Sequence, residues 1–544
     1  MLAIDSDSPR KEPRRGPDYS GRRRRIAVNT AIFSLATGLS RIAGLGREIL
    51  ASSYFATSGA FSAFTIAFQV PNLLRMLVAD QAITAAFVPV FTELLEQRRR
   101  AEAFRLASTF FFLIFAVLGS VTVVFVVLAP LVMPLFTGDA FSPALDSLTS
   151  GLSRLLFPVV VLLGLNGLCV AILNAYDHFT IPALAPLAWN VVIVVLLVVL
   201  RPLFEGPEEL YAYAIGVLAG TVVQFLMAFP VLRRHGFELR FAVDWRDPRV
   251  KQVVMLMLPV TVGLGVINVD LVINSTLGSL VSEQAPRAID AAFRLYQLPQ
   301  GMFSIALATV LFPALTRAAV RSDYPLLRGT MANGVRQILL LLIPAAAISA
   351  ALATPIVRLV YEHGEFGPES TDAVAEALLW FSFALPFNGA NLLLTRTFFS
   401  LQRPWTATTI AIASIVVNTA VSVALYAPLG IAGLVIGTVV GNAAMAAAQA
   451  WRLRSELGGI DGRRTAIAAG QMILAAGLLA GTAYATWWLL DDLLGRGLVA
   501  QCVSVGLALA AGGLVYIGSV LLMRIPEAGQ ILDLLAGRLR HRNP

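Results

Sequence analysis

The chain has few charged residues. Only 14% of its 544 residues are Asp, Glu, Lys or Arg, whereas soluble domains carry about 25%. With 57% hydrophobic residues and a mean hydropathy of +0.76, this composition excludes an ordinary soluble protein. Lysine occurs only at Lys11 and Lys251, so arginine supplies nearly all of the basic charge behind the formal net charge of +8. The arginines are spread between apolar segments rather than gathered on one domain. This distribution argues against a nucleic-acid partner and favours a membrane protein.

Cysteine and histidine are also scarce. Cys169 and Cys502 both fall in apolar segments, which excludes a disulfide framework and a cysteine-based metal site. The four histidines have no metal-ligand spacing. No phosphate-binding P-loop and no Ser/His/Asp or Cys/His constellation is present in the sequence. We therefore expect a protein that is not an enzyme and needs no organic cofactor.

Long apolar segments dominate the chain instead. Each is about 20 residues or longer, which is the length that crosses a bilayer core. They lie at residues 26–50, 61–91, 103–135, 154–174, 183–203, 210–231, 251–279, 287–317, 333–355, 371–397, 406–427, 429–451, 466–490 and 498–523. The sequence thus predicts an all-α polytopic membrane protein with about fourteen transmembrane helices.

The charges between these segments alternate along the chain. Basic loops include Arg98, Arg99, Arg100, Arg233, Arg234, Arg321, Arg403, Arg463 and Arg464. Acidic loops include Asp139, Asp146, Glu205, Glu208, Glu209, Glu362, Glu365, Glu369, Asp491 and Asp492. Only Arg201, Arg287 and Arg496 depart from the alternation. Because basic loops stay on the cytoplasmic side, both termini are predicted to be cytoplasmic.

A faint internal repeat suggests the domain organisation. Gln69 and Gln297, Pro71 and Pro299, and Asn190 and Asn418 share one offset along the chain. Paired repeats around a central site are a common transporter plan. We therefore expect two six-helix lobes around a central cavity, followed by two more helices. The predicted parts are a disordered basic arm (1–25), an N-terminal lobe (26–231), a cytoplasmic linker (232–250), a C-terminal lobe (251–453), helices 13 and 14 (466–523) and a cytoplasmic tail (524–544).

Four arginines lie inside the apolar segments, namely Arg41, Arg47, Arg75 and Arg294. A guanidinium group does not lose its proton, and each one costs roughly 2.5–3.5 kcal/mol at the bilayer centre. Only two carboxylates, Glu48 and Asp80, are close to them in sequence. We infer that these arginines line a cavity whose missing anion is the cargo. A diphosphate suits the guanidinium fork. The alternatives are arginines that extend to the membrane surface and a structural ion pair of Arg75 with Glu48 or Asp80.

Small, kinking and amide residues accompany these arginines. Gly44 and Gly46 lie between the first two arginines and leave room for a ligand or a bend. Pro71 and Pro299 are expected to kink their helices and open backbone groups toward a cavity. The amides Asn72 and Gln297 are expected to line that cavity beside the arginines.

A second polar group lies in the later segments. An intramembrane carboxylate at Asp270, with the amides Asn268 and Asn274 on the same segment and Asn418 on a later one, could hold a sodium ion or a proton. A hydrogen-bonded packing cluster is the alternative. Gly433, Gly437 and Gly441 have the four-residue spacing of a close-packing helix face.

Several motifs resemble those of the MurJ (MviN) lipid II flippases. They are Ser40-Arg-Ile-Ala-Gly-Leu-Gly-Arg-Glu48, Pro71-Asn-Leu-Leu-Arg75, Phe87-Val-Pro89, Ile172-Leu-Asn174 and Arg294-Leu-Tyr-Gln-Leu-Pro299. The likeness covers about residues 28–525. It implies translocation of undecaprenyl-diphosphate-linked disaccharide pentapeptide across the bacterial plasma membrane by alternating access, without ATP hydrolysis. It also implies that the four arginines and Glu48 are required, and that cell-wall synthesis proteins are partners.

The chain departs from this family at three positions. Ser62 replaces a common aspartate, and Gln297 stands where some relatives have glutamate. The sodium site of part of the family is matched by Asp270, Asn418 and Thr438, whereas Ser422 replaces an expected acidic ligand. The resemblance therefore predicts an anion site and leaves sodium or proton coupling open.

Three other functions remain as alternatives. The first is an exporter of drugs or of another lipid-linked oligosaccharide. The second is a membrane glycosyltransferase or polymerase that uses Glu362, Glu365 and Glu369. The third is a scaffold for cell-wall enzymes that transports nothing.

Overall fold

The described part of the chain is helical throughout. The computed structural model describes residues 19–78, 80–176, 178–241 and 244–529, and it has no β-strand in these ranges. The α-helices are α1 (Tyr19–Phe55), α2 (Gly59–Val78), α3 (Asp80–Glu96), α4 (Arg100–Val132), α5 (Pro143–Leu156), α6 (Pro158–Ala175), α7 (Thr180–Leu200), α8 (Leu210–Leu226), α9 (Phe229–Arg234), α10 (Pro248–Val281), α11 (Ala285–Pro299), α12 (Ala306–Val320), α13 (Tyr324–Ala351), α14 (Ala353–Tyr361), α15 (Pro368–Ser400), α16 (Pro404–Glu456), α17 (Gly462–Leu494) and α18 (Leu498–Leu522). Short 3-10 helices are η1 (Met133–Leu135), η2 (Arg201–Leu203) and η3 (Gly206–Glu209), and η4 (Gln300–Ile305) is a π-helix.

The length and apolar composition of these helices fit a membrane protein. Among the described residues, ten helical segments are long and apolar enough to cross a bilayer. One of them, α16, contains two of the predicted segments, because the chain reverses at Gly430, whose φ is 56°. The all-α membrane fold is therefore confirmed, whereas the total of about fourteen spans stays a prediction. The first helix begins at Tyr19, earlier than the predicted start at residue 26, and residues 1–18 of the predicted arm lie outside the described part.

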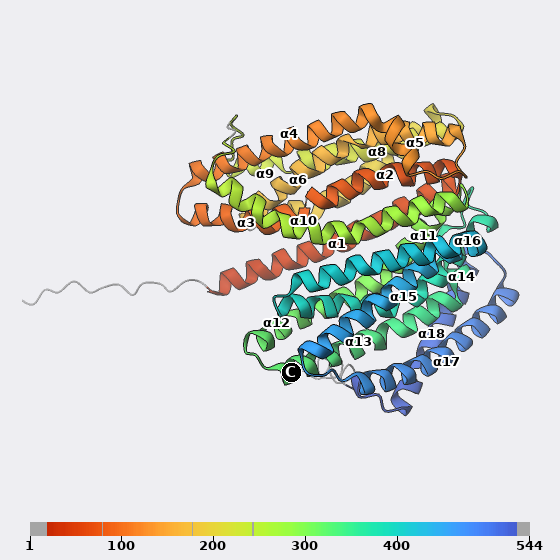
Figure 1. The fold of residues 1–544 in the computed structure, drawn as a ribbon. Coiled ribbons are helices and arrows are strands. Elements are labelled where there is room, and N and C mark those ends of the chain that lie inside the picture. The colour runs from red at the N-terminus through yellow and green to blue at the C-terminus, as the bar shows by residue number, and fades with distance from the viewer. Residues whose placement is uncertain (1–18, 79, 177, 242–243, 530–544) are drawn as a thin grey trace, which may run out of the picture.

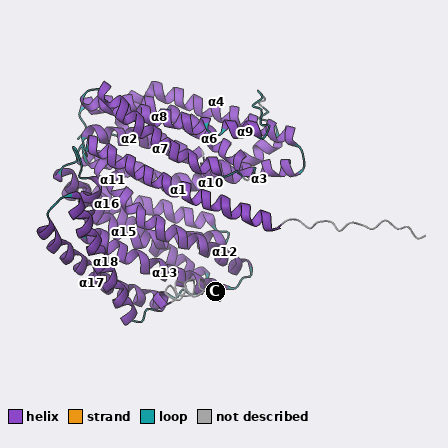
Figure 2. Ribbon diagram, turned by 180° about the vertical axis from the view of Figure 1, so that it is seen from behind, coloured by secondary structure: helices purple, strands orange, loops and turns teal. Residues whose placement is uncertain are grey.

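The helices form two groups with α1 between them (Figure 1). Figure 2 shows the same arrangement from the opposite side. One hydrophobic core runs from Ala51 to Val253 and fills the group of α2–α9. Two further cores fill the group of α11–α16. The buried residues of the first lie between Ala288 and Val435, and those of the second lie between Ala308 and Leu457. We call these the N-terminal group and the C-terminal group.

The helix α10 belongs to both groups. Near its start, Val250 and Val253 are buried in the core of the N-terminal group. Near its end, Leu277 and Val281 pack against the core of the C-terminal group. It packs against α2 and α3 of the N-terminal group and against α11 and α16 of the C-terminal group. The predicted C-terminal lobe, which starts at residue 251, therefore begins with a helix that also contacts the other group.

Direct hydrogen bonds join the end of α1 and the turn that follows it to the C-terminal group. We call this end, at Phe55, the distal end, and the end where α1 begins the proximal end. The Glu365 amide donates to Ser53 O at 2.8 Å, and the hydroxyls of Thr57 and Ser370 are 2.8 Å apart. Gly364, with φ of 63°, lies against Ser53 O so closely that a Cβ would overlap it. The Arg287 amide of α11 also donates to Ser62 Oγ of α2 at 3.3 Å, so the two groups are closed against each other at the distal end.

The last two helices form a hairpin on the outside of the C-terminal group. Buried residues of α17 and α18, such as Met472 and Tyr516, pack against Leu340 and Ile343 of α13. The Tyr516 hydroxyl donates to Leu340 O at 2.9 Å. The opposite face of α18 is apolar and exposed, as at Leu514, which suits a surface in contact with lipid.

Candidate functional site

A buried glutamate lies where α1 faces the C-terminal group. Glu48 is 2% exposed, and its Oε1 atom lies 2.5 Å from Arg287 Nη2 and 3.3 Å from Arg294 Nε. Arg47 Nη2 lies 3.9 Å from Glu48 Oε2. Because α1 and α11 carry these residues, the ion pairs connect the central helix with the C-terminal group.

A second carboxylate completes this cluster. Asp290 Oδ2 lies 2.9 Å from Arg287 Nη1 and 2.9 Å from Arg294 Nε. The three residues are three and four positions apart on α11, so they share one helix face. We call Arg47, Glu48, Arg287, Asp290 and Arg294 the ionic network. Its three guanidinium groups face two carboxylates, which leaves one excess positive charge.

Aromatic rings and hydroxyls support the buried guanidinium groups of this network. Arg287 lies over the Phe61 ring at 4.0 Å, and Arg47 lies over the Trp189 ring at 4.8 Å. Arg287 Nη2 also donates to Ser52 Oγ at 2.8 Å. Cation–π contacts of desolvated guanidinium groups contribute about 2 kcal/mol or more. The N-terminal group therefore helps to hold the cations in place.

The predicted arginines occupy different environments. Arg47 is buried and Arg294 keeps 39% of its side chain exposed, and both belong to the ionic network. Arg41 is exposed on α1 and faces η4, because a Cβ built on Gly301 would lie 3.9 Å from Arg41 Nη1. Arg75 lies on α2, but its side chain is outside the described part. The structure thus brings two of the four arginines together with Glu48.

The predicted supporting residues are only partly described. Asn72 is half-buried on α2, and Gln297 is exposed on α11. The side chain of Asp80 lies outside the described part. Gln297 lines the cavity described below.

The predicted kinks differ from one another. The helix α1 continues through Gly44 and Gly46, and a Cβ on Gly44 would lie 3.7 Å from the Asn190 amide of α7, whereas Gly46 faces open space. The helix α2 likewise continues through Pro71. At Pro299 α11 changes into the π-helix η4, and such segments are frequent at functional sites. Only Pro299 therefore coincides with a change of helix type.

Sequence reasoning missed Arg287 and Asp290 as members of the site. The sequence did carry a signal, since Arg287 was one of three arginines that departed from the loop-charge alternation. The other two pair with acidic neighbours, Arg201 with Glu209 at 2.6 Å and Arg496 with Asp491 at 3.7 Å. An arginine at the wrong end of a span thus marks a local carboxylate partner in all three cases.

A cavity of about 440 Å³ begins beside the ionic network. Asp290, Gln297 and Gln69 line it on the side of the network, and it extends between the helices of the C-terminal group. Asn418 and Thr438, two residues of the predicted sodium site, line its far side. The side chain of the third, Asp270, lies outside the described part.

Hydroxyls and amides surround these two residues. Asn274 Nδ2 donates to Thr438 Oγ1 at 3.3 Å, and Ser422 Oγ donates to Asn418 Oδ1 at 3.1 Å. In the described part of the chain, no group of three or more His, Cys, Asp or Glu side chains is placed to hold a metal ion. The side chains that the structure describes around Asn418 and Thr438 therefore offer only neutral ligand atoms to a cation.

Known proteins share both the sequence and the fold. The family model for "Lipid II flippase MurJ" matches residues 51–508. The lipid II flippase MurJ of Burkholderia cenocepacia is 32% identical over 416 residues, which cover 74% of this chain and 79% of that protein. A solved structure of a lipid II flippase MurJ in an inward closed conformation has a TM-score of 0.74 at 21% identity and covers 91% of this chain and 99% of its own. An inward-facing multidrug resistance transporter of the MATE family has a TM-score of 0.64 at 14% identity, over 78% of this chain and 94% of its own. The chain belongs to the MurJ family of lipid II flippases.

Proposed function

We propose that this protein is a lipid II flippase, which moves the undecaprenyl-diphosphate-linked peptidoglycan precursor from the cytoplasmic to the outer leaflet. Membership of the MurJ family supports this function. The observation that carries it is the excess positive charge of the ionic network between the two groups of helices. A diphosphate supplies the missing negative charge, and its oxygens match the guanidinium fork.

In this proposal the predicted lobes move about the ionic network. Residues 26–231 and 251–453 are the two lobes, 232–250 is their linker, and 466–523 adds the outer hairpin. The diphosphate contacts Arg41, Arg47, Arg75 and Arg294, while the polyprenyl tail stays in lipid. Closure at the distal end supports an arrangement that takes up cargo from the proximal end. The glycines Gly44 and Gly46 and the prolines Pro71 and Pro299 then serve as points of bending.

The proximal end is proposed to face the cytoplasm of a bacterial plasma membrane. Arg99, Arg403 and Arg463 lie near helix starts at this end, and basic residues are retained on the cytoplasmic side. Both termini are cytoplasmic in this orientation. The bilayer and lipid II are the expected partners, and contacts with cell-wall synthesis proteins stay a prediction.

The energy source is proposed to be the membrane potential or an ion gradient. A sodium ion or proton would act at Asp270, Asn418 and Thr438. Ser422 stands at the position of the expected acidic ligand, and its neutral hydroxyl donates hydrogen bonds to Asn418 Oδ1 and Leu434 O. Exchange of external sodium for potassium during a transport assay tests this part of the proposal.

Multidrug export is the main alternative within this fold. The excess positive charge of the ionic network disfavours drug cations.

Among the residues of the glycosyltransferase alternative, Glu362 accepts a hydrogen bond from Thr371 at 2.6 Å and lies 3.7 Å from Arg358, so it serves the packing of α14 on α15. A triple substitution of Glu362, Glu365 and Glu369 by Gln is expected to leave transport intact.

The function is tested by complementation of a flippase-depleted bacterium. Expression of the wild-type chain is expected to restore growth, and the variants Arg41→Ala and Arg75→Ala are expected to fail at equal membrane abundance. Growth with both variants would contradict an arginine-based cargo site. Lipid II binding in competition with a cationic drug separates a flippase from a drug exporter.

A further inference from the structure

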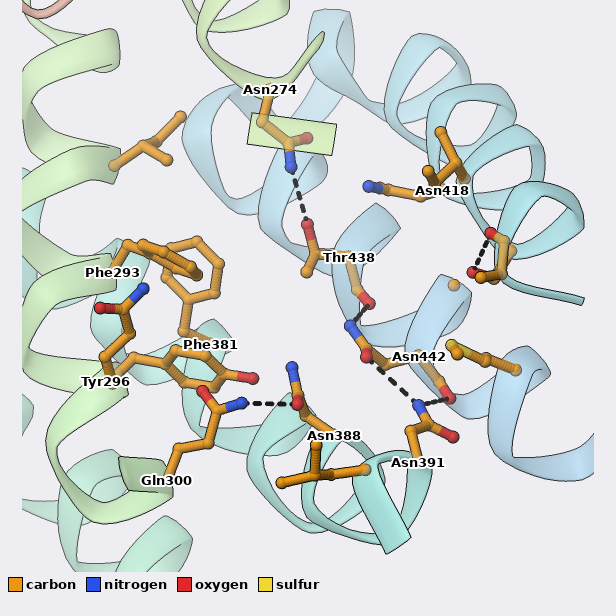
Figure 3. Close-up of a pocket in the computed structure, with 18 of the residues that line it drawn as sticks. Asn274, Phe293, Tyr296, Gln300, Phe381, Asn388, Asn391, Asn418, Thr438 and Asn442 are labelled. Atoms are coloured by element: carbon orange, nitrogen blue, oxygen red, sulfur yellow. Dashed lines mark hydrogen bonds between the residues drawn. The ribbon is translucent and has the colours of Figure 1, made fainter. Parts of the chain in front are cut away.

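The cavity beside the ionic network has one aromatic side. Phe293, Tyr296 and Phe381 line it, with ring centroids 5.6 Å apart for Phe293 and Tyr296 and 5.4 Å apart for Tyr296 and Phe381. In Figure 3 the three side chains gather on the same side of the cavity. They come from α11 and α15, so one wall of the cavity is an apolar, ring-lined surface.

Amide side chains occupy the facing positions and are held by hydrogen bonds. Gln300 Nε2 donates to Asn388 Oδ1 at 2.6 Å. Asn391 Nδ2 donates to Asn442 O at 3.0 Å, and Asn442 Nδ2 donates to Thr438 O at 2.9 Å. The hydrogen bond from Gln300 uses the side-chain oxygen of Asn388. Figure 3 shows the side-chain nitrogen of Asn388 pointing away from Gln300 into the cavity. The amides are therefore fixed in orientation before any ligand enters.

The described residues that line the cavity carry little charge. Asp290 is the single charged side chain among the described residues that line it. Its carboxylate is already paired with Arg287 and Arg294 at 2.9 Å each, so it offers little attraction to a cation. An anion finds no described lining guanidinium or ammonium group. A neutral ligand with many hydroxyl and amide groups fits these walls.

Saccharides have this chemistry. The C–H faces of a pyranose ring pack on aromatic rings, while hydroxyl and N-acyl groups pair with amides, which both donate and accept. A volume of about 440 Å³ lies within the range of roughly 300–1,000 Å³ for small-ligand sites. Asp290 borders the cavity and bonds to Arg294, so the cavity opens directly beside the proposed diphosphate position.

We propose that the cavity lined by Phe293, Tyr296, Phe381, Gln300, Asn388 and Asn442 binds the saccharide attached to the diphosphate of the cargo. This inference rests on the proposed function, because it assigns the diphosphate to the neighbouring arginines. It divides recognition between two places. The ionic network binds the diphosphate, and the cavity of amides and aromatic rings distinguishes a glycosylated lipid from a bare polyprenyl diphosphate.

The test compares the binding of two lipids to the purified full chain. One lipid is lipid II and the other is undecaprenyl diphosphate without sugars. Asn388→Leu removes one cavity amide of similar size and is expected to weaken lipid II binding about three- to tenfold, which is the net effect of one lost hydrogen bond. Its affinity for undecaprenyl diphosphate is expected to stay at the wild-type value. Tyr296→Phe removes only a hydroxyl group and serves as a milder second variant.

Two matched variants separate this inference from the function itself. Arg294→Gln is expected to weaken both lipids, and Gln501→Leu on α18, which removes an amide outside the cavity, is expected to weaken neither. Lipid II binding at wild-type affinity by both Asn388→Leu and Tyr296→Phe would overturn the saccharide site and leave the flippase proposal standing. Equal weakening of both lipids by Asn388→Leu would also overturn it. If the wild-type chain binds neither lipid, the proposed function fails and the saccharide site fails with it.

Discussion

Arg287 of the C-terminal group and Glu48 of the central helix α1 form a buried ion pair. The Nη2–Oε1 distance is 2.5 Å, and the side chains are 1% and 3% exposed. In sequence they are separated by the whole N-terminal group and by α10. Because the pair lies toward the closed distal end, separation of α1 from the C-terminal group at that end requires these charges to part or to exchange partners.

Arg287→Met is expected to destabilise the protein strongly. Removal of one partner from a buried ion pair costs about 3–5 kcal/mol, because the other charge is left without compensation. Arg105→Met is the matched control, since Arg105 pairs with Asp244 at 3.0 Å with 62% of its side chain exposed. Exposed pairs contribute about 0–1 kcal/mol. Thermal unfolding of both variants in detergent measures the difference, and equal melting temperatures would contradict a buried role for Arg287.

Arg47 and Arg41 are expected to differ in their effect on stability, although both are predicted cargo ligands. Arg47→Met removes a buried guanidinium that lies over Trp189 and beside Glu48, so we expect a loss of roughly 1–2 kcal/mol. Arg41→Met alters an exposed side chain and is expected to stay within about 0.5 kcal/mol of the wild type. Unfolding in chemical denaturant, followed by circular dichroism, separates the two. A larger loss for Arg41 than for Arg47 would refute the assigned environments.

The α16 hairpin is expected to tolerate no side chain at Gly437. A Cβ there would overlap Ser422 Oγ and lie 2.8 Å from Asn418 O, so Gly437→Ala forces the two halves of the hairpin apart. Overpacking of this kind costs typically about 1–3 kcal/mol. Gly470→Ala is the control, because nothing lies within 4 Å of a Cβ at that position of α17. It is expected to be neutral or slightly stabilising. A fall in melting temperature with Gly470→Ala alone would show that the close contact at Gly437 is misplaced.

A histidine pair at the proximal end is expected to make stability depend on pH. Partial burial lowers the pKa of His178 below its usual value, and the neighbouring His235 lowers it further. Their ring centroids are 6.2 Å apart, and Tyr176 lies 4.7 Å from His235. A histidine with a lowered pKa binds fewer protons in the folded state than in the unfolded state. Stability is therefore lost as the pH falls below the unfolded-state pKa of about 6.5.

His178→Gln is expected to reduce this loss. Melting temperatures at pH 7.5 and 5.5 give the comparison, with His363→Gln as the control histidine substitution. A drop between the two pH values that is unchanged in His178→Gln would mean that other groups cause it.

The fold could be predicted from the sequence to a large extent. Apolar length located most of the helices, although the chain reverses within α16 at Gly430, just inside the predicted segment 429–451. The burial cost of a charge also indicated that Glu48, Arg47 and Arg294 act near one another.

Other parts of the site could not be predicted, because they depend on tertiary packing. Arg287 looks like a loop residue in sequence, and only the docking of α11 on α1 and α2 places it over Phe61. The cavity amides Asn388 and Asn391 lie on α15, and Asn442 lies on the second half of α16. Singly, each resembles an amide that stabilises helix packing, and only their joint position beside the aromatic rings indicates a binding site.

The most direct measurement is the amount of lipid II exposed on the outer face of a flippase-depleted bacterium that expresses this chain. The account predicts that the wild type and Arg105→Ala restore exposure. It predicts that Arg41→Ala and Arg294→Ala reduce it at least about tenfold at equal membrane abundance, since a charge-assisted contact with the diphosphate is lost. Wild-type exposure of lipid II with both of these variants would contradict the claim that a cationic site between the two helix groups carries the cargo.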